Sequence, residues 1–350
     1  MSAFIASLGP PEIVGGVMML ALNAYVLMGG ADFGGGVWDL LASGPRRDAQ
    51  RALIADSIGP IWEANHVWLV IVVVMLFTAF PTAFALLGTV LHIPLTLMLV
   101  GIVLRGSAFV FRSYGSRAYA AQRRWGSVFA GASLITPILL GVIVGAIASG
   151  AVGRVQRLLT TPSATSFHEV FVAPWLGFFP LTVGLLALVL FAFLAAVYLT
   201  LATDDATLRE DFRRRALGAA VVAFVAAAGA LIVARIHAPV VGRGLVETPL
   251  ALALQGATAI AALTAIGALY SRRWQLARIA AAAQVSLVLW GWVMVQYPFI
   301  VPPVATLRGA AAPDITLELL LTALAIGAVV LIPSLVYLFR TFGSVRHEGR

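Results

Sequence analysis

The sequence predicts an all-α integral membrane protein with nine transmembrane helices. Hydrophobic residues make up 61% of its 350 residues and charged residues only 11%. The mean hydropathy is +0.98, which a soluble domain of this length does not reach. Apolar runs of about 20 residues or more, enough to cross a hydrocarbon core of about 30 Å, recur along the whole chain.

Each of the nine apolar runs predicts one transmembrane helix. The first eleven residues contain no Lys or Arg and make a poor signal peptide, so we expect the first run to be a retained helix. The second run opens with the polar stretch DSIGPIWEANHV, and the third contains Arg105. In chain order, the nine runs cover residues 12–31, 58–80, 82–111, 126–149, 174–202, 216–236, 250–270, 276–298 and 315–339.

The grouping of the helices follows from their order and from the short loops. We expect two four-helix bundles, at about 12–149 and 174–298, and one peripheral helix at 315–339. The longest connections, 150–173 and 299–314, are too short to form a soluble domain. Residues 1–350 are therefore predicted to form a single membrane domain.

Basic residues fix the predicted orientation, because they collect in cytoplasmic loops. All 23 are arginines. With the N-terminus outside and the C-terminus inside (N-out/C-in), 17 lie in cytoplasmic segments and five in outer ones. The outer five are Arg154, Arg157, Arg235, Arg243 and Arg308.

Composition also excludes several functions. The net charge of +8 comes from arginine clusters between apolar spans, which are typical of a membrane protein and not of a nucleic-acid-binding protein. The chain has no cysteine. Disulfides, thiolate nucleophiles, cysteine-bound zinc and iron–sulfur clusters are therefore excluded.

Three ionisable residues are predicted to lie at one level near the cytoplasmic side. Asp32 closes the first helix before the glycines at 34–36, Glu63 comes about five residues into the second helix, and Arg105 about six residues before the end of the third. A charge near the bilayer centre costs about 2.5–3.5 kcal/mol on insertion scales, so such residues favour a functional interpretation.

Further polar residues accompany Glu63 on the second helix. His66 is three residues away and shares its face, while Trp62 and Asn65 lie on the adjoining stripe. Carboxylates and an imidazole in a row are typical of membrane proton pathways. The alternative is a structural ion pair between Arg105 and either Glu63 or Asp32, which would only fix the helix packing.

Other candidate sites have less support. The motif E-x-x-H at Glu63 is half of a di-iron site, but the sequence has no second copy, so no metal site is predicted. His92 could bind haem, although a hydrogen bond to a neighbouring carbonyl explains it better. Gln296 and Tyr297 are weak candidates for binding a quinone or a lipid headgroup, since aromatic residues also anchor helices at membrane interfaces.

Several motifs together resemble subunit II of the cytochrome bd-type quinol oxidases. They are GADFGGGVWDLL at 30–41, DSIGPIWEANHVWLV at 56–70, LFTAFP at 76–81, LRGSAFVFR at 104–112, QYPFIVPP at 296–303 and IPSLVYLFRTF at 332–342. They occur in the family's order and cover nearly the whole chain. WEANHVWL, with Glu63, is more similar to the cyanide-insensitive branch than to the branch with aspartate there.

The resemblance implies a haem-free subunit of the bacterial inner membrane. It would pair with a haem-bearing subunit I, in a complex that oxidises quinol near the outer face and reduces dioxygen to water. Subunit II would support assembly and proton uptake from the cytoplasm. A small accessory subunit, and a quinone or lipid bound to this chain, are further possibilities.

The family's proton-pathway positions correspond to Asp32, Glu63 and Arg105. Gly29 departs from the pattern, because many members have aspartate there. Two other functions stay open: a secondary transporter that uses the same acids for ion coupling, and a scaffold subunit without a proton role. Broken helices with inverted symmetry, which would favour a transporter, are not evident.

Overall fold

The computed structural model describes residues 9–59, 62–114, 119–159 and 166–348. Within these ranges, nine helices are long and apolar enough to cross a membrane. The predicted fold class is therefore confirmed. The N-out/C-in orientation stays a prediction.

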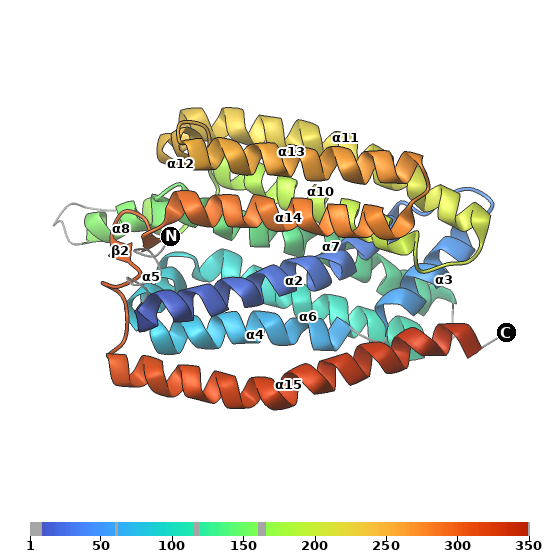
Figure 1. Cartoon of the computed structure of the whole chain (residues 1–350), viewed down its shortest axis with the longest axis horizontal. Coiled ribbons are helices and arrows are strands. Elements are labelled where there is room, and N and C mark those ends of the chain that lie inside the picture. Colours follow the sequence, from blue (N-terminus) through green and yellow to red (C-terminus); the bar gives the residue numbers. More distant parts are fainter. Residues whose placement is uncertain (1–8, 60–61, 115–118, 160–165, 349–350) are drawn as a thin grey trace.

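The described chain is almost entirely helical (Figure 1), and its two strands form one short antiparallel hairpin. The elements are α2 (Pro10–Leu40), α3 (Arg47–Ile58), α4 (Trp62–Ala79), α5 (Pro81–Val90), α6 (His92–Tyr114), α7 (Tyr119–Ala148), α8 (Ala151–Leu159), α9 (Phe167–Phe171), α10 (Phe178–Leu199), α11 (Ala206–His237), α12 (Pro239–Gly244), α13 (Pro249–Tyr270), α14 (Trp274–Gln296), β1 (Phe299–Val301), β2 (Ala305–Thr306) and α15 (Asp314–Glu348).

Helix α10 lies at the centre of the fold. Its residues 190–197 are all buried, and it packs against α2, α7 and α11. Helices α2 and α7 pack on one side of it, with α4 and α6 beyond them, and α11 and α14 pack on the other, with α13 beside them (Figure 1). Because α10 contacts α2 and α7 about as extensively as α11, the division into two separate four-helix bundles stays a prediction, as does the single domain.

Helix α15 runs along the outside of the fold, beside α2 and α4 (Figure 1). None of the residues in its most apolar 18-residue window is buried within this chain. It also extends to Glu348, beyond the predicted end at 339.

Helix α2 continues to Leu40, so the prediction that Asp32 closes it is wrong. The glycines at 34–36 do not form a turn but allow close helix packing. A Cβ atom on Gly34 would lie 1.9 Å from the Phe191 carbonyl oxygen of α10, and one on Gly36 would lie 2.1 Å from Ser133 Oγ of α7. Asp32 is consequently inside the helix, eight residues or about 12 Å before its end.

The second and third predicted helices begin or break at different places. Residues 47–58 form the separate helix α3, and α4 begins at Trp62 instead of residue 58. The predicted helix 82–111 is divided into α5 and α6 at Leu91. Pro94 explains this break, because its ring clashes with the carbonyl four residues earlier, at Val90, where α5 ends.

The remaining differences lie at the two ends of the fold. Helix α11 begins at Ala206, ten residues before the predicted start at 216, with Asp205 accepting hydrogen bonds from its first turn. The predicted loop 150–173 contains α8 and α9, and the predicted loop 299–314 contains the β1–β2 hairpin. We call the end with α8, β1 and β2 the hairpin end (Figure 1).

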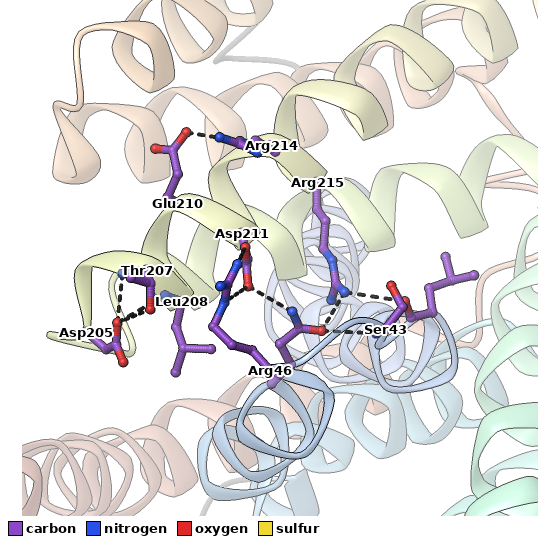
Figure 2. Close-up of polar contacts among 11 residues, drawn as sticks. Ser43, Arg46, Asp205, Thr207, Leu208, Glu210, Asp211, Arg214 and Arg215 are labelled. Carbon is purple, nitrogen blue, oxygen red and sulfur yellow. Dashed lines mark hydrogen bonds and ion pairs between the residues drawn. The ribbon is translucent and has the colours of Figure 1, made fainter.

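The opposite end, formed by α3, the last turn of α2 and the first turns of α11, is called the arginine-rich end. Figure 2 shows how polar side chains join α3 to α11 there. Arg46 donates two hydrogen bonds to Asp211, at 2.5 and 2.8 Å, which raise the pKa of Arg46. Gln50 donates to Asp211 at 2.9 Å and accepts from Arg215 at 2.7 Å. These contacts hold α3 flat across the end of the fold.

Candidate functional site

A buried polar cluster, which we call the Asp32 cluster, joins α2, α4 and α6. Asn65 Nδ2 donates to the Asp32 carboxylate at 2.5 Å, and an Arg105 guanidinium nitrogen donates to the Asp32 backbone carbonyl at 2.8 Å. The exposed fractions of Asp32, Asn65 and Arg105 are 4%, 0% and 2%. The structure therefore brings together three of the six residues predicted from the sequence.

Aromatic rings surround the Arg105 guanidinium. Its central carbon lies 4.8 Å from the ring centre of Phe33 and 5.3 Å from that of Phe129. Among the described ion pairs, none joins Arg105 to Asp32 or Glu63. The predicted alternative of a direct structural ion pair is thus not formed, and Arg105 instead binds the backbone of the helix that carries Asp32.

His66 lies beside this cluster, and one of its ring nitrogens has no partner among the described residues. Its Nδ1 lies 2.8 Å from the Trp62 carbonyl oxygen and donates to it, since a carbonyl can only accept. The other nitrogen, Nε2, is then the acceptor of a neutral imidazole, and it is buried without a protein partner. The ring lies edge-on to Tyr25 and Phe33, at 6.0 and 6.3 Å. His66 can therefore accept a proton here.

Glu63 does not join the cluster. Because α4 begins at Trp62, Glu63 lies in the first turn of the helix and is exposed. The predicted depth assumed a helix starting at residue 58, and the depth of Glu63 in the membrane stays a prediction. Trp62 itself packs against Phe109 and against the backbone at Gly106 of α6, so it closes the cluster on the side of the arginine-rich end.

Several buried polar atoms in this region have no hydrogen-bond partner among the residues that the structure describes. They are Tyr25 Oη, Asn65 Oδ1, His66 Nε2, Arg105 Nε, Ser133 Oγ and Thr136 Oγ1. Buried polar groups are usually satisfied, and those without protein partners typically bind ordered water. These six atoms, in neighbouring helices, provide polar sites at which water can bind around Asp32.

Comparison with known families identifies the chain. The family model described as cytochrome bd terminal oxidase subunit II matches residues 10–342. The chain belongs to this family. As a cytochrome bd subunit II with nine apolar helices, it is a multi-pass protein of the bacterial inner membrane.

Curated relatives agree with this assignment. The chain is 32% identical to cytochrome bd ubiquinol oxidase subunit 2 of Bacillus subtilis (strain 168) over 119 residues, 34% of each chain. It is 26% identical to cytochrome bd-I ubiquinol oxidase subunit 2 of Escherichia coli (strain K12) over 183 residues, 52% of this chain and 46% of the relative. The chain thus spans less than half the length of these relatives.

A solved structure shares this fold over nearly the whole chain. The structure of bd oxidase from Geobacillus thermodenitrificans has a chain that matches with a TM-score of 0.73 and 20% sequence identity. The match covers 96% of this chain and 99% of the other. At this identity the likeness concerns the fold alone.

Gly29, the departure from the cytochrome bd subunit II pattern, has a packing explanation. A Cβ atom there would lie 2.9 Å from the ring of Tyr25, one turn earlier on α2. Tyr25 is 1% exposed, so its ring occupies the space that a side chain at position 29 would need. An acid at position 29 and the observed position of Tyr25 are therefore incompatible.

Sequence reasoning missed a second buried acid of this cytochrome bd subunit II, Asp39, which is 3% exposed. Arg112 donates two hydrogen bonds to its carboxylate, at 2.9 and 3.0 Å. The guanidinium of Arg51 lies 3.9 Å from the same carboxylate. Only the true end of α2 at Leu40 places Asp39 inside a helix; the predicted end at 31 would leave it in a loop.

The remaining candidates lie elsewhere. Gln296 donates to the Ile300 carbonyl at 3.1 Å and so ties α14 to β1, and Tyr297 is 54% exposed. Both lie at the hairpin end, away from α3 (Figure 1). His92 contacts the Thr89 carbonyl at 2.9 Å, as expected, but is exposed and not in the core. No group of three or more metal-binding side chains occurs among the residues that the structure describes.

Proposed function

We propose that this chain is the haem-free subunit II of a bd-type ubiquinol oxidase and conducts protons from the cytoplasm through the Asp32 cluster. It pairs with a haem-bearing subunit I, and the complex oxidises quinol and reduces dioxygen to water. The predicted N-out/C-in orientation, if it holds, would put the arginine-rich end, and hence the Asp32 cluster, toward the cytoplasm.

The observation that carries the proton role is a buried carboxylate beside unpartnered polar atoms. Asp32 holds one hydrogen bond from Asn65 and none from Arg105 at its carboxylate oxygens. Because no arginine among the described residues holds these oxygens, the Asp32 carboxylate can bind and release a proton without first breaking an ion pair. Water bound to the neighbouring atoms of Tyr25 and His66 would extend the pathway toward the middle of the membrane.

Reduction of dioxygen to water consumes protons. When these protons come from the cytoplasm while quinol releases its own protons outside, the reaction builds a membrane potential without pumping. A subunit that carries no haem can therefore set the turnover of the whole complex, because it delivers a substrate of the reaction.

Purification of the tagged chain from its native membrane tests this function. We expect a haem-bearing partner to copurify, visible by its absorbance, and the complex to consume oxygen when ubiquinol is supplied. A chain that is isolated alone, without haem absorbance, and that binds a small solute would contradict the proposal and favour a secondary transporter.

Glu63 is expected to contribute less than Asp32. In Glu63→Gln, oxygen consumption by the purified complex should fall about threefold, equivalent to less than 1 kcal/mol of barrier, with unchanged haem spectra and partner content. The reason is that an exposed acid in the first turn of α4 collects protons but can be bypassed by water. Turnover identical to that of the unaltered complex would remove Glu63 from the pathway.

A further inference from the structure

The ion pair of Asp39 and Arg112 lies one layer closer to the arginine-rich end than the Asp32 cluster. Asp39 is seven residues, or about two turns, after Asp32 on α2, and Arg112 is seven residues after Arg105 on α6. The Arg51 and Arg112 side chains are 28% and 24% exposed, whereas Asp39 is buried. The pair therefore connects the surface of the protein to its interior.

The ring of Phe129 separates the two layers. The Arg105 and Arg112 guanidinium carbons lie 5.3 and 6.0 Å from its centre. Phe129 is 2% exposed and packs against Phe109. Ions and isolated water are excluded from such an apolar layer, so it forms a barrier between Asp39 and Asp32.

A small cavity lies at this barrier, on the Asp39 side. It is lined by Asp39, Ile54, Ala55, Ile58, Phe109, Arg112 and Phe129. Its size corresponds to about one water molecule. Its lining is mostly apolar, with Asp39 and Arg112 as its charged residues. Helix α3 contributes Ile54 and Ile58 and so forms the outer wall.

Polar side chains continue on the other side of the barrier. On α7, Phe129 is followed at helical spacing by Ser133 and Thr136, which are fully buried and whose hydroxyl oxygens have no protein partner. Ser133 faces α2 at Gly36, between Asp32 and Asp39, and Thr136 faces α6 at Gly101. Hydrogen-bonding groups thus lie on both sides of one aromatic ring.

We propose that Asp39 is the residue that takes up protons for the Asp32 cluster and that the Phe129 ring is the barrier across which they pass. Uptake of a proton by the Asp39 carboxylate breaks its two hydrogen bonds from Arg112, and the proton is then released to a water in the cavity. That water passes a proton inward when the ring moves aside, toward Ser133 and Asp32. This inference rests on the proton role proposed for Asp32 above.

The experiment measures ubiquinol-driven oxygen consumption by the complete purified complex, per haem. In Asp39→Asn we expect turnover to fall about tenfold. The matched control is Asp211→Asn, which removes another arginine-paired acid at the same end of the fold (Figure 2) that does not line the cavity. It should leave turnover unchanged.

A second substitution separates proton uptake from a structural role. Adding Phe129→Ala to Asp39→Asn should restore turnover to within about twofold, because water then crosses the opened barrier without Asp39. Adding Phe129→Leu instead keeps the barrier apolar and should not restore turnover. Asp39→Asn alone could assemble poorly, because it leaves the Arg112 charge unpaired. In that case the double variant Asp39→Asn with Arg112→Gln, which removes both charges, replaces it as the starting variant.

The outcomes distinguish this inference from the proposed function. Normal turnover in Asp39→Asn, or a loss of turnover that Phe129→Ala does not reverse, would overturn the role of Asp39. Slow turnover in Asp32→Asn would then still support the proton pathway through Asp32. Normal turnover in both acid variants would overturn the pathway as well.

Discussion

Replacing Asp32 with asparagine is expected to lower ubiquinol-driven oxygen consumption about a hundredfold, the lower range for loss of a positioned acid or base. Asparagine has nearly the same shape and can still accept the hydrogen bond from Asn65, and the Arg105 contact to the backbone carbonyl is unaffected. The loss would therefore reflect the missing carboxylate. Oxygen-electrode rates, normalised to haem absorbance, measure it.

The control for this substitution is Asp314→Asn, because Asp314 is an exposed acid that begins α15, outside the Asp32 cluster. Its turnover should stay unchanged. If Asp32→Asn assembles with its partner and turns over at the full rate, the proton role is rejected and the chain acts as a scaffold subunit.

Replacing Gly34 with alanine is expected to destabilise the protein by about 1–3 kcal/mol or more. The added methyl group would lie 1.9 Å from the backbone oxygen of Phe191 and 2.8 Å from the Ala195 Cβ. Since the first of these atoms is backbone, no side-chain rotation can relieve the clash, and α2 must move away from α10. The thermal unfolding midpoint of the purified complex should fall accordingly.

Gly16→Ala is the matched control on the same helix. A Cβ atom at Gly16 would have no neighbour within 4 Å, so alanine should be neutral or stabilise the helix by up to about 1 kcal/mol through its higher helix propensity. Equal midpoints for the two variants would contradict close packing of α2 against α10 as the reason for the glycine run.

The sequence predicted the helices well because hydrophobic length is a strong signal. It failed where the reason for a residue lay in another helix. Gly34 and Gly36 were predicted to follow the end of the first helix. Their role in close packing is visible only from the positions of Phe191 and Ser133 in the folded protein. The break at Leu91 could have been found from Pro94, whose effect on the preceding turn is local.

The candidate site was predicted in part. Asp32 and Arg105 were recognised because a charge within an apolar run is conspicuous, and Asn65 because it is close to Glu63. Glu63 was expected further along its helix, because the helix was predicted to start at residue 58 and α4 begins at Trp62. Asp39, Phe129 and Ser133 were missed: the first seemed to lie in a loop, and the other two are unremarkable until the packing of α7 against α2 is known.

The contacts of Asp32 also bear on how the chain is made. Its partner Asn65 follows 33 residues later and Arg105 follows 73 residues later. At a synthesis rate of about 5–20 residues per second, Asp32 leaves the ribosome roughly 4–15 s before Arg105. During this interval the first helix lacks the two partners that Asp32 has in the folded protein.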